Sequence, residues 1–117
     1  MTNEDSVQAL AALAHVHRLA VFRALVEQGP QGLPAGAIAE AVGLLPSSLT
    51  FHLRHLQHAG LITQRRASRQ LFYAADFAAM NDLVGYLTEN CCGGDADACA
   101  PVCATPKQST PRKRKAA

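Results

Sequence analysis

All four cysteines of the chain lie in one short stretch: Cys91, Cys92, Cys99 and Cys103. The first two are adjacent, and Gly93-Gly94 separates them from the others. A cysteine often serves as a small apolar side chain, but a polar, glycine-rich segment offers little apolar surface to fill. Thiolates bind soft ions and undergo reversible oxidation. The four cysteines are therefore candidates for chemistry at sulfur.

The cysteine spacing leaves several such chemistries open. A structural zinc site more often contains C-x2-C pairs than two adjacent cysteines followed by single ones. A redox switch would join Cys91 or Cys92 to a later cysteine as a disulfide. A three-thiolate site would need the adjacent pair and one later cysteine. Cys103 lies 11 residues beyond Cys92 and Cys99 lies 7 beyond it. Loop closure differs between them by only about 0.4 kcal/mol, so entropy does not select the third ligand.

A second signal is the segregation of charge along the chain, whose formal net charge is +2. Residues 46–75 contain no acidic residue and four arginines: Arg54, Arg65, Arg66 and Arg69. Residues 76–106 contain five acidic residues and no lysine or arginine, and five basic residues follow in 107–117. A purely cationic segment in a small domain is typical of proteins that bind phosphate groups, including those of nucleic acids.

Apolar spacing, glycine and proline predict the helices that must position these arginines. Helices are expected over 5–14, over a second stretch that ends at Gln28, over 35–42 and over 46–59. Gly43 and Gly60 would close the last two, and Pro46 suits the first position of a helix. Because the third and fourth helices are only a few residues apart, they form a helix-turn-helix candidate.

The helix expected over 46–59, here called the recognition helix, has two distinct faces. One face carries three leucines that would seat it on a core: Leu49, Leu53 and Leu56. The opposite face carries Ser47, Phe51, Arg54 and His58. Hydroxyls bond base edges or phosphates, phenylalanine packs on thymine methyls, and arginine binds phosphate or guanine. Taken alone, the pattern also fits an ordinary amphipathic surface helix.

A predicted β-hairpin follows this helix directly. Residues 61–66 and 70–73 are short β-prone runs, and three residues separate them. Three arginines are expected near the tip: Arg65, Arg66 and Arg69. A hairpin with only positive charge, next to a candidate recognition helix, is typical of a wing that grips the sugar-phosphate backbone or an adjacent minor groove.

The last predicted helix, over 77–89, has a broad apolar stripe. The first helix is also apolar along one side, and a small winged domain has little room to bury both. We therefore expect a homodimer, in which two recognition helices would address a palindromic site. The predicted fold class is mainly α with a β-hairpin wing: a winged helix-turn-helix of order α-α-α-α-β-β-α.

From about Leu10 to Leu87 the chain resembles the ArsR/SmtB family of winged-helix transcriptional repressors. The resemblance rests on LAHVHRL (13–19), IAEAVGL (38–44), SSLTFHLRHL (47–56) and AGLI (59–62). One departure is Leu45, where family members often have a polar residue such as glutamine. The resemblance implies a homodimer that binds double-stranded operator DNA. Its groove contacts would come from Ser47, Ser48, Thr50, Phe51 and Arg54, and its phosphate contacts from Arg65, Arg66 and Arg69.

Sensors of this family place their metal sites in different elements. The helix over 35–42 lacks the cysteine pair of one arsenic-sensing type, and the helix over 77–89 lacks the histidines of the zinc-sensing type. The segment YLTENCC (86–92) resembles arsenic repressors whose site is a C-terminal cysteine pair plus one later cysteine. The resemblance thus implies an As(III) site formed by Cys91, Cys92 and Cys99, with Cys103 as the alternative third ligand. Sb(III) or a methylated trivalent arsenical is an alternative inducer.

Three other functions stay open: a repressor that senses Cd(II), Pb(II) or Zn(II), a thiol-redox switch, and a constitutive DNA-binding module. His52, His55 and His58 recur along the recognition helix, but a metal there would occupy the DNA surface, so we interpret them as packing and surface residues. We find no nucleophile-base pair or phosphate-binding glycine loop, which argues against an enzyme, and no need for an organic cofactor.

The expected organisation has three parts. Residues 1–90 form the DNA-binding and dimerisation domain, 91–104 the cysteine-rich inducer-binding segment, and 105–117 a basic, disordered tail that can add non-specific DNA affinity. The start of the chain lacks the pattern of a secretory signal, and no apolar run is long enough for a membrane span. We therefore expect a cytoplasmic protein with no membrane partner.

Overall fold

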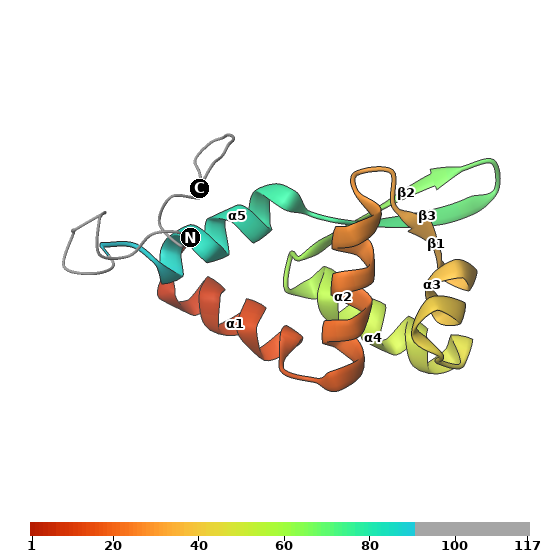
Figure 1. Cartoon of the computed structure of the whole chain (residues 1–117), viewed down its shortest axis with the longest axis horizontal. Helices are drawn as coiled ribbons and strands as arrows, with labels where there is room; N and C mark the ends of the chain where they lie inside the picture. Colours follow the sequence, from red (N-terminus) through yellow and green to blue (C-terminus); the bar gives the residue numbers. More distant parts are fainter. Residues whose placement is uncertain (91–117) are drawn as a thin grey trace. The chain divides into compact units, whose positions relative to one another are not determined.

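The computed structural model describes residues 1–90, which form five helices and three strands (Figure 1). The helices are α1 (Asn3–Leu13), α2 (Val16–Gln28), α3 (Ala35–Val42), α4 (Pro46–His58) and α5 (Phe77–Leu87). The strands are β1 (Leu33–Pro34), β2 (Ile62–Ala67) and β3 (Gln70–Ala75). The predicted winged helix-turn-helix fold class is confirmed. The four cysteines and the basic tail lie outside the described residues.

Capping side chains, glycine and proline mark several of the helix ends. The Thr2 hydroxyl accepts a hydrogen bond from Asp5 N at 3.0 Å, and the Asp5 carboxylate accepts one from Thr2 N at 3.2 Å, which forms a capping box at α1. Gly43 ends α3 with a φ of 72°, in the left-handed region that favours glycine. Pro46 occupies the start of α4, as predicted. Local sequence therefore fixes the boundaries of the helix-turn-helix.

The sheet contains one strand more than predicted. β2 and β3 form the expected hairpin, and β1 pairs with the outer edge of β3, so the strand order is β1-β3-β2. β1 is only two residues long and includes Pro34, so it has no detectable period in the sequence. Gly32, just before β1, has a φ of 76°, and a Cβ there would lie 2.3 Å from the carbonyl oxygen of Tyr73. The loop between α2 and β1 therefore packs closely against β3 of the wing.

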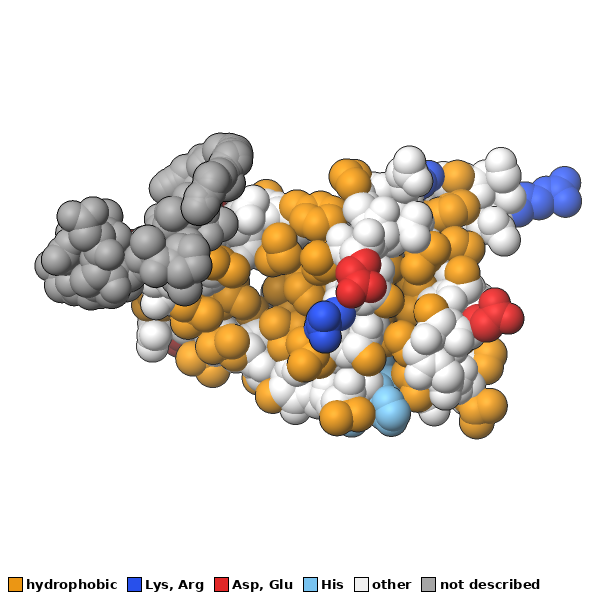
Figure 2. Space-filling model, in the orientation of Figure 1, with side chains coloured by type: hydrophobic (Ala, Val, Ile, Leu, Met, Phe, Trp, Pro, Cys, Tyr) orange, Lys and Arg blue, Asp and Glu red, His pale blue; other side chains and the backbone are white. Residues whose placement is uncertain are grey.

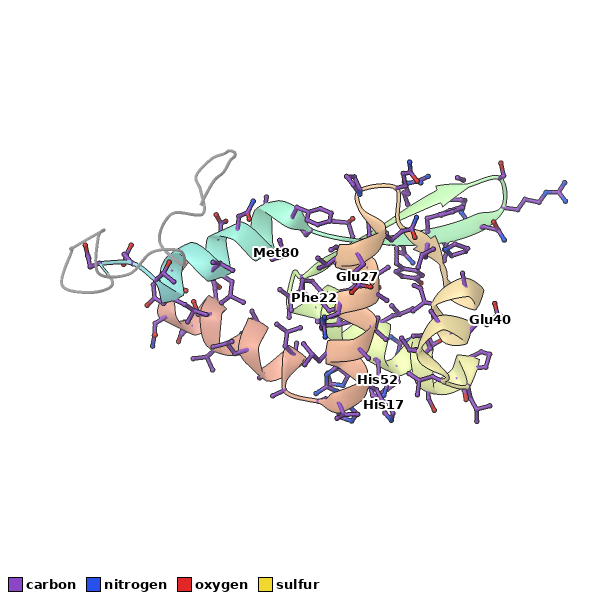
Figure 3. The ribbon with its side chains drawn as sticks, in the orientation of Figure 1. His17, Phe22, Glu27, Glu40, His52 and Met80 are labelled. Carbon is purple, nitrogen blue, oxygen red and sulfur yellow. The ribbon has the colours of Figure 1, made fainter. Side chains whose placement is uncertain are left out.

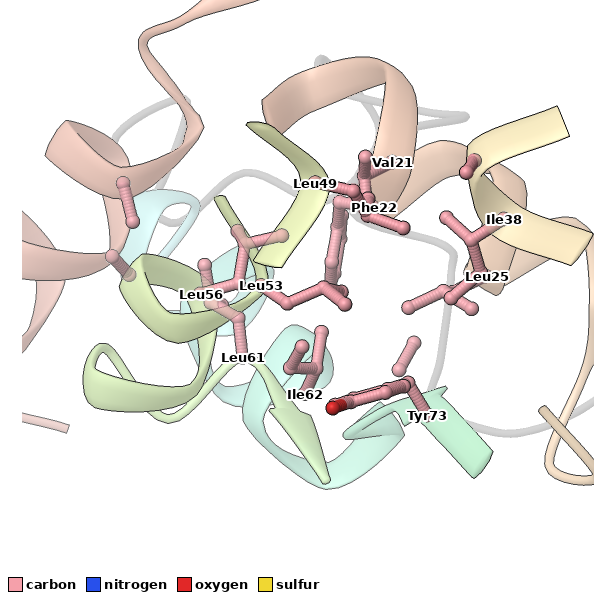
Figure 4. Packing of buried hydrophobic residues seen from close by; sticks show 14 of the residues in the cluster. Val21, Phe22, Leu25, Ile38, Leu49, Leu53, Leu56, Leu61, Ile62 and Tyr73 are labelled. Carbon is pink, nitrogen blue, oxygen red and sulfur yellow. The ribbon is translucent and has the colours of Figure 1, made fainter. Parts of the chain in front are cut away.

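The core lies between α2, α3, α4 and the sheet. Its largest fully buried side chains are Leu25, Ile38, Leu49, Leu56, Leu61 and Val21. Figure 4 shows these residues together with Leu53, Ile62 and Tyr73. Each such leucine contributes roughly 1.5–3 kcal/mol by leaving water. The three leucines predicted to seat the recognition helix are all in this core, at most 2% exposed.

α5 contains the boundary between two compact units, Met1–Leu83 and Val84–Ala117. The helix begins where Asp76 Oδ1 accepts a hydrogen bond from Ala79 N at 3.0 Å. It ends at Leu87, two residues before the predicted end. Within the second unit, the Thr88 hydroxyl donates to the Val84 carbonyl at 2.8 Å.

No single helix of the described residues is both long and apolar enough to cross a membrane. α1 and α2 meet the length and composition criteria only when they are taken together, and the chain bends by 101° between them.

Candidate nucleic-acid interface

The predicted DNA-contacting residues of α4 lie together on its exposed face. Ser47, Ser48, Thr50, Phe51 and Arg54 are all exposed. The leucines on the opposite face hold the helix against the core, so this exposed face has a fixed position within Met1–Leu83. The arrangement offers two serine hydroxyls, one threonine, one aromatic ring and one guanidinium to a ligand. That set can bond phosphates and base edges and pack on thymine methyl groups.

Two of these side chains are oriented by contacts within the helix. The Thr50 hydroxyl donates to the Pro46 carbonyl at 3.0 Å, which leaves its oxygen free to accept. The Phe51 ring meets the His55 ring edge-on, with 4.6 Å between ring centroids. Phe51 is nevertheless 57% exposed, which is unusual for a large aromatic side chain. A solvent-exposed ring on a rigid helix is well suited to a flat apolar partner.

The three wing arginines have different environments. Arg65 Nη2 donates to the Gln31 carbonyl at 2.8 Å, and its guanidinium lies 4.7 Å from the centroid of the Phe72 ring. Arg65 therefore braces β2 and β3 against the loop before β1 rather than extending from the tip. Arg66 follows it in β2, and Arg69 lies in the turn itself; both are exposed. Figure 2 shows basic side chains at the outer end of the hairpin.

The wing turn holds two residues in a conformation that favours glycine. Ser68 has a φ of 50° and Arg69 a φ of 71°, and neither is glycine. A non-glycine residue in this region costs roughly 1–2 kcal/mol. Backbone strain of this kind is often retained at functional sites. A need for the positive charge of Arg69 at the tip of the wing would explain why glycine does not occupy this position.

Replacing Arg69 by glycine is therefore expected to have opposite effects on stability and on DNA binding. The free energy of unfolding should rise by about 1 kcal/mol because the strain is relieved. The slope of log K for DNA against log salt should become shallower by about 0.9 for each phosphate contact that is lost, and a homodimer loses one in each subunit. Urea unfolding and fluorescence anisotropy at several salt concentrations measure the two effects. Ser68→Asn is the control, since asparagine tolerates the left-handed region and Arg69 remains. An unchanged salt slope in Arg69→Gly would show that the wing tip does not contact phosphate.

The structure brings together histidines that sequence periodicity did not connect. His52 is only 7% exposed, whereas His55 and His58 on the same helix are exposed. The His52 ring lies 4.7 Å from that of His15 and 5.7 Å from that of His17, between ring centroids. The interpretation of His52 as a packing residue agrees with its burial. His15 and His17 come from the start of α2, so only the tertiary fold reveals the group.

Neutral imidazoles are favoured at two of these positions. Desolvation lowers the pKa of His52, and the nearby charges of His15, Arg18, His17 and His55 lower it further. Desolvation, followed by the charges of Arg18, His17 and His55, likewise lowers the pKa of His15. Among residues 1–90, no group of three or more histidine, cysteine, aspartate or glutamate side chains is arranged to hold a metal ion.

Several known proteins are similar to this chain in sequence or in fold. A family model described as a helix-turn-helix domain matches residues 13–65. The chain is 33% identical over 89 residues to the nodulation protein NolR of Rhizobium meliloti, a match that covers 76% of this chain and 70% of NolR. The crystal structure of NolR from Sinorhizobium fredii is similar at 32% identity and a TM-score of 0.59, over 74% of this chain and 83% of that one.

A second solved structure extends the comparison to oligomeric state. It is the homodimeric winged helix-turn-helix DNA-binding domain of a possible ArsR-family transcriptional regulator from Mycobacterium bovis. The similarity has 25% identity and a TM-score of 0.59, and it covers 80% of this chain and 86% of that chain.

Proposed function

Because the chain belongs to the ArsR/SmtB family of winged helix-turn-helix transcriptional regulators, we propose that it is a metalloid-responsive repressor. In this proposal a cytoplasmic homodimer binds operator DNA and is released when As(III) binds three C-terminal cysteines, Cys91, Cys92 and Cys99. Family membership makes the chain a DNA-binding transcriptional regulator, and its homologues are regulators rather than enzymes. The dimer, the operator contacts and the inducer are the proposed parts.

One observation carries the proposed DNA contact: the exposed face of α4. Its polar and aromatic side chains have no role in the core, while the leucines opposite them fix the helix in place. The exposed Arg66 and Arg69 lie in the hairpin that follows α4 in the chain. A fixed helix of this width fits the major groove of B-DNA, and the wing arginines would add phosphate contacts beside it.

Exposed apolar side chains support a homodimer. On α1, Val7 is 58% exposed and Leu10 is 42% exposed. In the second unit, Val84 is 44% exposed and Leu87 is 56% exposed. Such side chains at successive turns of a helix are typical of a surface that a partner covers. The homodimeric neighbour from Mycobacterium bovis has the same fold, and two copies would present two α4 helices to a palindromic operator.

The proposed inducer site lies outside the described residues and rests on the chemistry of its ligands. As(III) is soft and thiophilic, so adjacent thiolates at Cys91 and Cys92 with a third from Cys99 suit it. Cys103 is the alternative third ligand. Cys91 follows the end of α5 by only four residues. Closing the chain around the ion would therefore act on the end of α5, and through it on the spacing of the two α4 helices.

The energetic requirement for this switch is modest. A 100-fold loss of operator affinity needs about 2.7 kcal/mol of coupling, which is within the usual allosteric range. Because coupling is reciprocal, operator DNA must weaken As(III) binding by the same factor.

A titration of DNA-bound protein separates this proposal from its alternatives. Labelled operator, selected from a random pool, is followed by fluorescence anisotropy while arsenite, antimonite, a methylated trivalent arsenical, cadmium or peroxide is added. We expect release by trivalent arsenicals. Release by cadmium alone would favour a divalent-metal sensor, and release by peroxide alone would favour a redox switch. A complex that none of them disturbs would indicate a constitutive DNA-binding module.

If Phe51 packs on a thymine methyl group, operator affinity should depend on that methyl group. Replacing thymine by uracil removes one methyl group, and losing an apolar contact of that size costs roughly 0.8 kcal/mol, or about a fourfold loss of affinity. We expect this loss at one thymine or more in each half-site for the wild type. In Phe51→Ala the same substitution should have no effect, because the partner is gone. Anisotropy with singly substituted operators measures both. Equal losses in the two proteins would contradict this role of Phe51.

A further inference from the structure

Three imidazoles meet where α2 begins beside α4: His15, His17 and His52, here called the histidine cluster. The ring centroids are 4.7 Å apart for His15 and His52, 5.5 Å for His15 and His17, and 5.7 Å for His17 and His52. Figure 3 shows His17 at the start of α2 next to His52 on α4. His52 projects from the buried side of the helix whose other side carries the proposed DNA contacts. The cluster therefore connects the buried face of α4, by which the helix is seated on the core, to the start of α2.

The burial of His52 and the hydrogen bond to His15 both favour neutral imidazole rings. His52 is 7% exposed, and its Nδ1 atom is buried without a hydrogen-bond partner. A proton on that nitrogen would have neither water nor a hydrogen-bond acceptor beside it. His15 Nδ1 accepts a hydrogen bond from His17 N at 3.1 Å and so caps α2. A proton on that nitrogen would remove the acceptor.

The surrounding charges also oppose a cation at His52. Four nearby groups lower the pKa of His52 further. They are His15, His17 and Arg18 at the start of α2 and His55 on α4. Arg18 is held in place because its Nε donates to the Ala12 carbonyl at the end of α1. The other charged side chains on the helices and the strand packed against α4 are exposed: Glu4, Asp5, Arg23, Glu27, Glu40, Arg65 and Arg66.

Metal binding does not explain the cluster, because its donor atoms are not arranged to hold an ion within the described part of the chain. The ligand that remains is the proton. We propose that the histidine cluster makes the seating of α4, and hence operator binding, dependent on pH, with the seated helix requiring a neutral His52. This inference rests on the proposed DNA-binding role of α4.

The sign of the effect follows from proton linkage. When α4 leaves its seat, His52 enters water and regains an ordinary pKa near 6.5. The seated state has the lower pKa, so the unseated state binds more protons below about pH 6.5. Acid therefore favours the unseated helix, and the seating energy is complete only above that pH. For one proton, the equilibrium constant for unseating should rise by at most about tenfold between pH 7.5 and pH 5.5.

The test combines hydrogen exchange, NMR and operator binding on the full-length wild-type protein. We expect α4 amides to exchange faster at pH 5.5 than at pH 7.5, by at most about tenfold, after correction for intrinsic rates. Operator affinity should fall only below about pH 6.5, by at most about tenfold per pH unit, and should level off below the pH where the resonance of seated His52 titrates. Affinity that rises on acidification, or that falls at a pH unrelated to the His52 titration, would overturn the proposal.

Variants localise the effect. His52→Gln cannot titrate and should bind operator at pH 7.5 like the wild type, but without the loss in acid. His58→Gln is the matched control on the exposed side of the same helix and should keep that loss. Where His52→Gln does not fold, the double variant His15→Gln/His17→Gln removes two groups that lower the pKa of seated His52, so the acid loss should become smaller. The same acid loss in His52→Gln as in the wild type would overturn the inference, whereas absence of operator binding at pH 7.5 in the wild type would instead refute the proposed function.

Discussion

Replacing Arg54 by alanine is expected to weaken operator binding by about 1–3 kcal/mol, or roughly 5- to 150-fold. Arg54 is exposed on α4, one turn beyond Phe51 and Thr50 on the same face. A guanidinium in that position can donate two parallel hydrogen bonds to guanine or bind a phosphate, and alanine can do neither. Because the side chain is not part of the core, the free energy of unfolding should change by less than about 0.5 kcal/mol. Anisotropy titrations and urea unfolding measure the two quantities.

Arg23→Ala is the matched control for this experiment. Arg23 is also an exposed helical arginine, but it lies on α2 and forms an ion pair with Glu27 at 3.9 Å. Both variants lower the net charge by one, so general electrostatic attraction to DNA weakens equally. Only Arg54→Ala should lose the larger, sequence-dependent part of the affinity. Equal losses in the two variants would contradict a specific role for Arg54.

Replacing Cys91 or Cys92 by serine is expected to abolish release of the operator by arsenite. Each substitution removes one of three thiolates, and a hydroxyl does not replace a thiolate for a soft ion. The proposed 100-fold loss of operator affinity on arsenite addition should therefore disappear, while affinity without arsenite stays at the wild-type value. Anisotropy with saturating arsenite measures the difference directly.

The later cysteines provide internal controls for the site. If Cys99 is the third ligand, Cys99→Ser should also prevent release and Cys103→Ser should respond like the wild type. The opposite pattern would assign Cys103, and partial responses in both would mean that either can serve. Release by arsenite that survives in both Cys91→Ser and Cys92→Ser would refute the proposed inducer site.

The parts of the fold that were predictable are those that local sequence controls. The leucine spacing and Pro46 predicted the position and orientation of α4, because a helix with one apolar face can bury only that face. The hairpin was predictable because two β-prone runs lie close together in sequence. Consequently, the predicted outward orientation of Ser47, Phe51 and Arg54 agrees with their exposure on α4.

The parts that were not predictable depend on contacts between distant residues. β1 is a strand only because it pairs with Phe72 and Tyr73, about forty residues later in the chain. The contact of Arg65 with Gln31 depends on the same approach, so its sequence position suggested a wing-tip role that its geometry does not show. His15 and His52 are 37 positions apart in the sequence, and no periodicity relates them.

Chemical-shift mapping tests most directly the central claim that α4 and the wing form the DNA-binding surface. Selected operator is added to isotope-labelled full-length protein at pH 7.5, and backbone amide shifts are followed. We predict the largest changes at the exposed face of α4 and at the tip of the wing: Ser47, Ser48, Thr50, Phe51, Arg54, Arg66 and Arg69. Changes confined to α1, α3 or the end of α2, with those seven residues unaffected, would contradict the claim.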